Sequence, residues 1–200
     1  MPYKMKRNRA HILIFSTLSV LLACALLCAA PLPSQAATPD RQSREDDRVQ
    51  LLEDREYFPA FMKAIQGAEN EIIMSFFLFK TANHKKSYTD RLLAALVRAA
   101  DRGVTVRIVL ERGNRGHGSL TDKSNGETAA RLTGKGIDVR FDSPHVTTHT
   151  KVAVIDRRYI FLGSHNLTNS ALKYNHELSV VIDSPSMARE AIRYINSLYK

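Results

Sequence analysis

The sequence of 200 residues contains only two cysteines, Cys24 and Cys28, and both lie in an apolar segment near the N-terminus. The chain that follows has no thiol, which excludes disulfides and cysteine-ligated zinc from it in any redox compartment. The sequence also lacks internal repeats, and it has no low-complexity run beyond a short polar linker. Nothing in it separates two folded domains, and its 44% of hydrophobic residues is enough for one core.

The N-terminal segment is organised like a secretory signal peptide. Four basic residues come first, an apolar run covers residues 12–30, and two prolines and small residues lead to a cleavage point at Ala36. We predict a signal peptide over residues 1–36, a polar linker over residues 37–47, and a secreted or periplasmic protein. Residues 12–30 are also long enough to be retained as a membrane anchor. Lipidation at Cys24 is a third interpretation, which the continuation of the apolar run past this residue disfavours.

Basic residues outnumber acidic residues most clearly in the middle of the chain. The predicted mature chain carries 25 basic and 20 acidic residues, whereas residues 80–173 alone carry 17 basic and 8 acidic residues. Such a stretch indicates an anionic partner, either nucleic acid or a phospholipid surface. On charge alone, a solvated lysine-rich surface explains the excess equally well.

The pattern of apolar residues predicts alternating strands and helices over residues 48–200. Apolar and β-branched runs predict strands at residues 49–52, 72–79, 104–110, 137–141, 152–155, 160–162 and 178–182. Helical spacing predicts helices at residues 59–68, from Thr89 or Asp90 to Gly103, at 128–132 and at 186–199. This order predicts an α/β fold, a mixed β-sheet sandwiched between helices on both faces, with part of the sheet antiparallel.

One stretch carries an unusual set of polar side chains. His149 and Lys151 are two residues apart, so a strand places them on the same face. The tetrapeptide Gly163-Ser164-His165-Asn166 follows the next predicted strand, where a loop of small residues can bring a hydroxyl and an amide beside that pair. The ammonium, hydroxyl and amide are donors for the oxygens of a tetrahedral phosphate, and the imidazole is a nitrogen nucleophile.

The spacing His149-x-Lys151-x4-Asp156-x6-Gly163-Ser164-x-Asn166 resembles the HKD signature of the phospholipase D superfamily. Residues 110–116 and 175–182 resemble segments of the small, single-motif secreted endonucleases of that superfamily. The similarity extends from about Val49 to the C-terminus. The resemblance implies the phospholipase D and nuclease-like fold, with a single HKD domain over residues 48–200, and phosphoric diester hydrolase activity.

The resemblance also implies a two-step mechanism. His149 attacks phosphorus to form a phosphohistidine, which water hydrolyses, while Lys151, Ser164 and Asn166 bind the phosphoryl oxygens. Members of the superfamily need two HKD motifs per active site and this chain has one, which implies a homodimer with a shared active site. The second subunit's His149 then protonates the leaving oxygen, and Glu177 matches the carboxylate that orients a histidine.

Other residues of the motif region are expected to support the site. The resemblance implies that Asp156 holds its loop together through ion pairs, and Gly163 is likewise expected to be structural. His165 and His176 flank motif residues, and we expect them to pack or to support the reacting groups.

The mechanism implied by the resemblance uses no metal and no cofactor. His145 and His149 are four residues apart, which is the spacing of a helical zinc pair. Pro144 and the β-branched residues between the two histidines disfavour a helix there. We therefore predict that the site holds no metal.

The motif does not name the substrate, because the superfamily cleaves DNA, RNA, phosphatidylcholine and cardiolipin with the same catalytic set. The small size and lack of long loops favour a non-specific endonuclease with an open basic groove. The side chains expected to contact phosphates are Lys80, Lys85, Lys86, Arg112, Arg115, Arg157 and Arg158. Glu111, Arg112 and Asn114 are expected either to line this cleft or only to close the turn after their strand. One alternative is a phospholipase D-type hydrolase of phospholipids such as phosphatidylcholine, phosphatidylglycerol or cardiolipin. Another is a silent module that only binds anionic polymers, which the complete set His149, Lys151, Asn166 and Glu177 disfavours.

Overall fold

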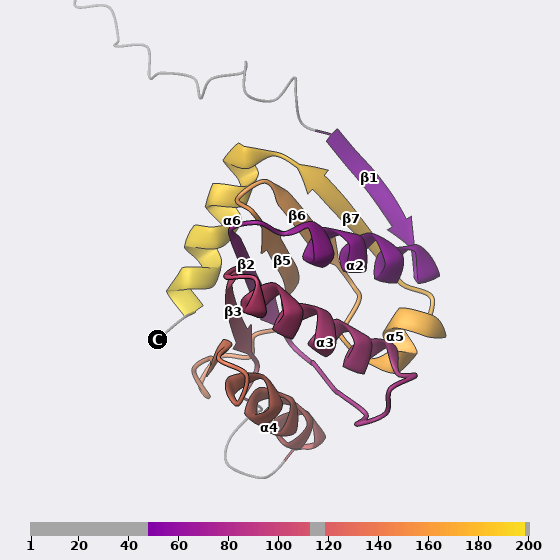
Figure 1. Cartoon of the computed structure of the whole chain (residues 1–200), viewed down its shortest axis with the longest axis vertical. Helices are drawn as coiled ribbons and strands as arrows, with labels where there is room; N and C mark the ends of the chain where they lie inside the picture. Colours follow the sequence, from indigo (N-terminus) through magenta and orange to yellow (C-terminus); the bar gives the residue numbers. More distant parts are fainter. Residues whose placement is uncertain (1–47, 113–118, 199–200) are drawn as a thin grey trace, which may run out of the picture. The chain divides into compact units, whose positions relative to one another are not determined.

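The computed structural model of the chain describes residues 48–112 and 119–198, which form one α/β domain (Figure 1). The strands are β1 (Arg48–Glu53), β2 (Glu71–Phe76), β3 (Thr105–Leu110), β4 (Asp138–Phe141), β5 (Lys151–Ile155), β6 (Tyr159–Gly163) and β7 (Leu178–Asp183). The helices are α2 (Tyr57–Gly67), α3 (Tyr88–Asp101), α4 (Leu120–Thr133), α5 (Asn169–Lys173) and α6 (Pro185–Leu198), and a 3-10 helix η2 (Asp54–Glu56) precedes α2.

The seven strands form one mixed sheet in the order β1-β7-β6-β5-β2-β3-β4. Strands β2, β3 and β4 run parallel, and the other neighbouring pairs are antiparallel. Helices α3 and α4 join the parallel strands, because a parallel connection must return along the sheet. A tight turn joins β5 to β6, and its residues Asp156 and Arg157 have φ angles of 52° and 55°. The predicted mixed sheet with an antiparallel part is confirmed.

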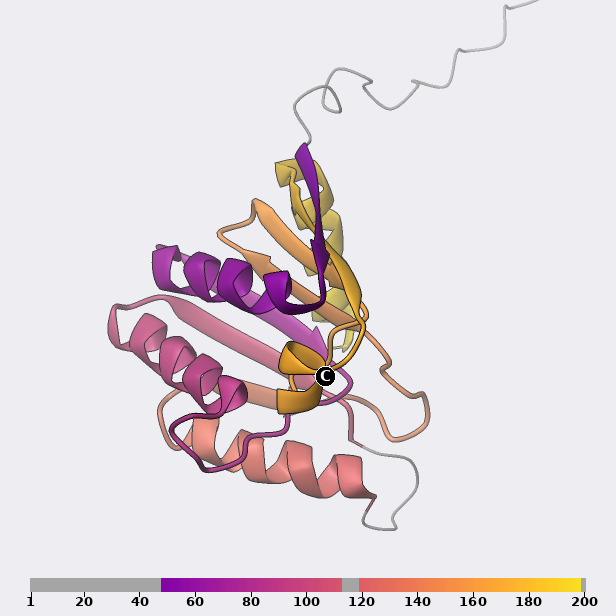
Figure 2. The same cartoon turned by 90° about the vertical axis from the view of Figure 1, so that its right-hand side faces the viewer.

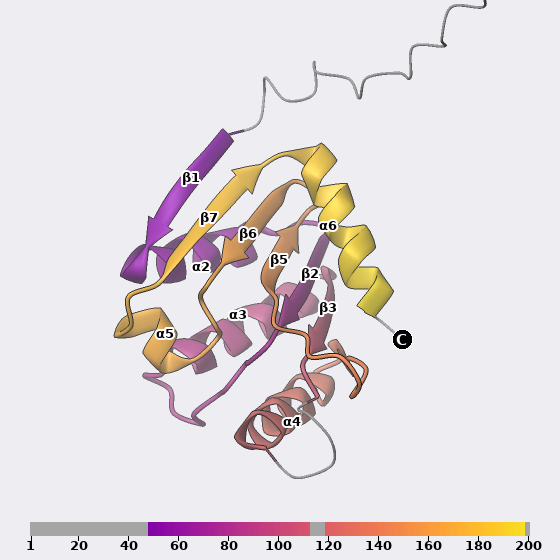
Figure 3. The same ribbon diagram turned by 180° about the vertical axis from the view of Figure 1, so that it is seen from behind.

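Helices cover both faces of the sheet, but unequally (Figures 2 and 3). Helices α2 and α3 pack against each other on one face, where Phe61, Leu96 and Ile108 are fully buried. On the other face, α6 packs against β2, β5 and β6 over Val109 and Val154. Seen from behind, β7 and β1 carry no helix on the α6 face (Figure 3).

The predicted elements are present, although several bounds differ. Helix α4 begins eight residues before the predicted start, at Leu120, because Ser119 caps it by accepting a hydrogen bond from the Asp122 N–H at 3.1 Å. Strand β2 ends at Phe76 rather than at residue 79, and Phe79 instead forms an isolated bridge with Leu167. Helix α5 was not predicted, since five residues are too few to show helical periodicity.

The strand register defines two opposite ends of the sheet. Lys151 lies opposite Phe76, Phe76 lies beside Leu110, and Leu110 lies beside Phe141. These residues lie at one end of their strands, next to His149, and we call this end of the sheet the histidine end. The opposite end of the sheet holds the β5–β6 turn at Asp156 and the first residues of β1, β2 and β3, and we call it the turn end.

No helix within residues 48–112 and 119–198 is both long and apolar enough to cross a membrane. The predicted signal peptide of residues 1–36, the linker of residues 37–47 and the alternative anchor of residues 12–30 lie outside the described residues. These assignments therefore stay predictions.

Candidate active site

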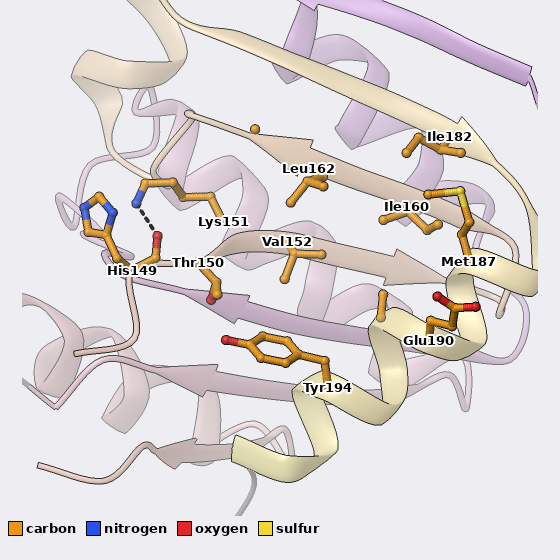
Figure 4. Close-up of a pocket in the computed structure, with 12 residues that line it drawn as sticks. His149, Thr150, Lys151, Val152, Ile160, Leu162, Ile182, Met187, Glu190 and Tyr194 are labelled. Atoms are coloured by element: carbon orange, nitrogen blue, oxygen red, sulfur yellow. Dashed lines mark hydrogen bonds between the residues drawn. The ribbon is translucent and has the colours of Figure 1, made fainter. Parts of the chain in front are cut away.

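His149 and Lys151 lie together at the histidine end of the sheet (Figure 4). Lys151 is the first residue of β5 and is buried, whereas His149 precedes the strand and is exposed. The Lys151 Nζ donates a hydrogen bond to the backbone oxygen of His149 at 2.8 Å. Burial lowers the pKa of Lys151, and the negative charge of Glu177 opposes this shift. The ammonium is thus held beside the imidazole, and Glu177 is close enough to act on it.

An aromatic side chain that the sequence analysis did not single out packs against both groups. The ring of Phe77 lies 4.7 Å from the ring of His149, and the Lys151 Nζ lies 5.1 Å from the same ring. The Phe77 N–H donates to the backbone oxygen of Thr150 at 2.8 Å, which fixes its place beside the strand. The sequence offered only a weak signal, because Phe77 continues the apolar run of β2 beyond the point where the strand ends.

Ser164 and Glu177 meet on the loops that follow β6 and precede β7. The Ser164 hydroxyl donates a short hydrogen bond to Glu177 Oε2 and accepts one from the Leu178 N–H at 3.1 Å. The Asn175 side-chain amide donates to Glu177 Oε1 at 3.1 Å. Both carboxylate oxygens of Glu177 are therefore bound within the subunit. Among the described residues, the His149 side chain forms no hydrogen bond with Glu177 or with any other group.

Asp54 fixes the position of Glu177, and its role was missed from the sequence. The Glu177 N–H donates to Asp54 Oδ1 at 2.8 Å, and the Asp54 N–H donates to the Glu177 backbone oxygen at 2.9 Å. His176 is fully exposed, and its Nδ1 lies 3.1 Å from Asp54 Oδ2. The hydrogen bond from the Glu177 backbone and the neighbouring His176 lower the pKa of Asp54. His176 therefore supports the loop, as expected. No spacing rule pointed to Asp54, which is more than a hundred residues away along the chain.

Asn166, the last residue of the motif, lies two residues beyond Ser164. Its side-chain Oδ1 is buried and has no hydrogen-bond partner in the described part of the chain. Buried polar atoms are nearly always hydrogen-bonded, so this oxygen is an exception. Because the oxygen is an acceptor, a bond from Asn166 to a phosphoryl oxygen has to come from its side-chain nitrogen.

The remaining motif residues are structural. Asp156 accepts backbone hydrogen bonds from Glu69, Asn70 and Glu71 at 2.7 to 3.0 Å, so it holds the entry of β2 through amides rather than through the ion pairs implied by the resemblance. At Gly163, an added Cβ would collide with Ser179 on β7. The motif glycine is therefore needed for the close approach of β6 and β7.

His165 is buried and packs, as expected. Its ring stacks on Tyr57 with centroids 4.4 Å apart, and its Nδ1 lies 2.7 Å from the hydroxyl of Ser179. Its Nε2 lies 2.9 Å from the backbone oxygen of Asp54. Burial lowers the pKa of His165.

Buried polar groups fix the segment that leads to His149. The Thr148 N–H donates to Glu111 Oε2 at 2.5 Å, and the Thr148 hydroxyl donates to the buried Asp142. The Asn125 side chain, fully buried on α4, donates to the backbone oxygens of Phe77 and Glu111 at 2.9 and 2.8 Å. Glu111 therefore holds this segment from within, and Asn125 ties together the ends of β2 and β3.

The expected phosphate-binding residues are distributed over both ends of the sheet. Arg112 is exposed at the histidine end, 5.8 Å from the ring of Phe141. Arg157 and Arg158 lie at the turn end, where they pair with Glu71 and Asp183 at 2.6 Å. The structure does not bring these two arginines to His149, since the whole length of β5 separates them. Asn114 and Arg115, which were also expected there, lie outside the described residues.

A groove of about 460 Å³ runs from the histidine end along the α6 face (Figure 4). It begins at His149 and Lys151 and continues between the strands and α6, where Leu162, Met187 and Tyr194 line it. Its walls are mainly apolar. Within residues 48–112 and 119–198, no group of three or more His, Cys, Asp and Glu side chains is arranged to hold a metal ion.

Curated relatives share this sequence over part of their length. Cardiolipin synthase B of Shigella flexneri is 36% identical over 138 residues, which cover 63% of this chain and 31% of that protein. Phospholipase D of Rickettsia felis is 34% identical over 106 residues, which cover 52% of this chain and 50% of that protein. The chain thus spans about a third of the first relative and half of the second.

A solved structure and a family model match most of the domain. The crystal structure of Nuc from Salmonella typhimurium, a phospholipase D family member, matches with a TM-score of 0.64 and 27% identity, over 77% of this chain and 95% of that chain. The model of the family described as "Cardiolipin synthase, PLD-like domain" matches residues 61–199, which include the whole HKD signature and Glu177. The chain therefore belongs to this PLD-like domain family, within the phospholipase D superfamily of phosphodiesterases.

Proposed function

We propose that this chain hydrolyses the phosphodiester bonds of nucleic acid through a phosphohistidine formed on His149. The observation that carries the proposal is that His149, Lys151 and Ser164 lie together at the histidine end, next to the carboxylate of Glu177. His149 is exposed, so its imidazole is open to a phosphate from solvent.

Each polar group has one part in the proposed reaction. An imidazole nitrogen of His149 attacks phosphorus, and the leaving oxygen departs with a proton from a general acid. Lys151, Ser164 and Asn166 hold the phosphoryl oxygens and stabilise the charge that builds on them. Water then attacks the phosphohistidine, which releases the phosphate product and restores the imidazole.

A second copy of the chain completes the proposed site, since one chain carries only one histidine of the required pair. Glu177 forms no hydrogen bond with His149 of its own subunit, where Ser164 and Asn175 bind it, so we assign it to the imidazole of the second subunit. Apolar side chains on the uncovered part of the α6 face offer a surface for that copy. Their exposed fractions are 62% for Val49, 56% for Leu51, 45% for Leu162 and 54% for Leu178.

Nucleic acid is the favoured substrate because basic side chains follow the two strands that end at the histidine end. Lys80 follows β2 and Arg112 follows β3, so both leave the sheet at the histidine end. Lys85 and Lys86 are exposed on the loop between β2 and α3. Such contacts bind phosphates without regard to sequence, as a non-specific endonuclease requires.

The second candidate substrate is a phospholipid, and the apolar groove favours it. The groove starts at His149, and its volume of about 460 Å³ and mainly apolar walls suit part of an acyl chain. The names of the relatives, a cardiolipin synthase and a phospholipase D, point in the same direction.

Catalysis is tested with His149→Ala and a matched control, His145→Ala. His145 is also exposed, but it has no place in the proposed reaction. We expect His149→Ala to lose at least about a hundredfold in turnover, since acid–base catalysis alone contributes about 10² to 10⁴. We expect His145→Ala and the addition of EDTA to change little. Residual activity of His149→Ala above one hundredth of wild type contradicts the mechanism.

The substrate is tested with plasmid, RNA and cardiolipin vesicles side by side. Cleavage of plasmid or RNA with intact vesicles supports the first proposal, and intact nucleic acid with hydrolysed vesicles replaces it by the second. The shared site is tested by refolding wild type together with excess His149→Ala. Activity should then fall as the square of the wild-type fraction, and a linear fall shows that each subunit works alone.

A further inference from the structure

A second concentration of positive charge lies at the turn end of the sheet. Four arginines and one glutamate line a cavity of about 320 Å³, which gives this arginine cavity a formal charge of +3. They come from three separate parts of the chain: the start of the sheet (Glu71, Arg107), the β5–β6 turn (Arg157) and α6 (Arg189, Arg193).

Only some of these arginines are paired with an acidic side chain of the domain. Glu71 is buried, and its carboxylate oxygens lie 2.6 Å from Arg157 Nε and 3.9 Å from an Arg107 guanidinium nitrogen. Arg189 and Arg193 are exposed and form no hydrogen bond or ion pair within the described part of the chain. They are one helical turn apart, and like charges at this spacing destabilise a helix. Within residues 48–112 and 119–198, no ion pair offsets this repulsion.

The turn that carries Arg157 is held firmly in place. Asp156 and Arg157 both adopt left-handed backbone conformations, which fit the twist of a two-stranded hairpin. The Asp156 carboxylate binds three backbone amides at the start of β2, and Glu71 binds the Arg157 guanidinium. The cavity therefore has one wall at Arg157, which Glu71 binds, and a second wall at two long, exposed side chains of α6.

Helix α6 separates the arginine cavity from the candidate active site. One flank of the helix, with Met187 and Tyr194, faces the groove that leads to His149. The other flank, with Arg189 and Arg193, faces the arginine cavity. The groove that leads from His149 along α6 is mainly apolar, and Lys151 is the only lysine or arginine among the described residues that lines it. This groove therefore offers a bound nucleic acid strand no row of basic side chains toward the arginines.

We propose that the arginine cavity binds a phosphate group, and that the source of this phosphate is the headgroup of an anionic phospholipid. Guanidinium groups pair with phosphate oxygens through two parallel hydrogen bonds, and a phosphate replaces the missing partners of the α6 arginines. The polypeptide enters the sheet at Arg48, which pairs with Asp183 in the same row as the β5–β6 turn. In the sequence, the turn end is thus preceded by residues 12–30, which are the alternative membrane anchor of the sequence analysis. This membrane contact requires no catalysis and stands apart from the proposed reaction.

The test compares Arg189→Gln/Arg193→Gln with Arg91→Gln/Lys123→Gln, each made in the full chain. Both pairs are exposed helical residues and remove the same charge, but the second pair lies outside the arginine cavity. Sedimentation is measured with phosphatidylcholine vesicles that contain or lack phosphatidylglycerol. We expect the α6 pair to weaken binding to the anionic vesicles about 30-fold, since each basic residue contributes about a factor of five, and the control pair to weaken it much less. A third variant, Arg189→Lys/Arg193→Lys, keeps the charge but loses the planar guanidinium.

The readouts separate the possible ligands and keep this inference distinct from the proposed function. Turnover of a small soluble phosphodiester should be unchanged in the α6 pair, whereas His149→Ala should bind vesicles normally. Equal losses in the two double variants overturn the proposal, because the attraction is then unspecific. If the protein binds inorganic phosphate but does not bind vesicles, the ligand of the cavity is free phosphate, and the lipid proposal is wrong. Loss of oligonucleotide binding with unchanged vesicle binding assigns the cavity to nucleic acid and also overturns it.

Discussion

Replacement of Gly163 by alanine tests why the motif contains a glycine. Gly163 pairs with Ser179 across β6 and β7, and an alanine Cβ would lie 2.5 Å from the Cβ of Ser179 and closer still to its Cα and Oγ. Because one of these atoms is backbone, a side-chain rotation does not relieve the collision, and the two strands must separate. Overpacking costs about 1–3 kcal/mol, and an obstructing backbone atom places this case near about 3 kcal/mol. The expected fall in melting temperature is about 6–12 °C for a domain of this size.

The assay is urea and thermal unfolding of Gly163→Ala beside Gly126→Ala. Gly126 lies inside α4, and a Cβ there meets nothing within 4 Å, so the same substitution should stabilise the protein by about 0.5–1 kcal/mol. Adding Ser179→Gly to Gly163→Ala should restore only part of the loss, because the Ser179 Cα remains. A change below about 1 kcal/mol for Gly163→Ala, or full rescue by Ser179→Gly, refutes the reasoning.

Asp156→Ala should lower the free energy of unfolding by about 2 kcal/mol, because three backbone amides lose a charged acceptor, and Asp156→Asn should cost less in the same urea titration. Burial depresses the pKa of folded His165, so the unfolded chain binds this proton more readily, and the stabilisation present above about pH 6.5 is lost as the pH falls. His165→Asn should therefore flatten the dependence of stability on pH between about 7.5 and 5.5, and an unchanged slope argues against it. Glu177 raises the pKa of Lys151 against the effect of burial, so Glu177→Gln should move the alkaline limb of the pH–rate profile to lower pH, and an unmoved limb excludes a protonated Lys151 from the reaction.

The sequence alone determined the fold class, the superfamily and the main candidate residues. Periodicity and turn residues are local properties, so the strands and long helices could be predicted from them, with errors at their ends that reach eight residues in α4. The HKD spacing is also local: His149 and Lys151 are two residues apart, and Gly163, Ser164 and Asn166 follow one short strand later. A constellation built from neighbouring segments can be recognised before the structure is known.

Only the tertiary structure decided which distant residues lie at the same end of the sheet. Arg157 and Arg158 are close to His149 in sequence but lie at the turn end, because β5 runs from the histidine end to the turn end. Phe77 and Asp54 are far from the motif in sequence, yet both contact its residues or their neighbours. Strand order and direction arise from pairings between segments many residues apart, and these pairings leave no local pattern in the sequence.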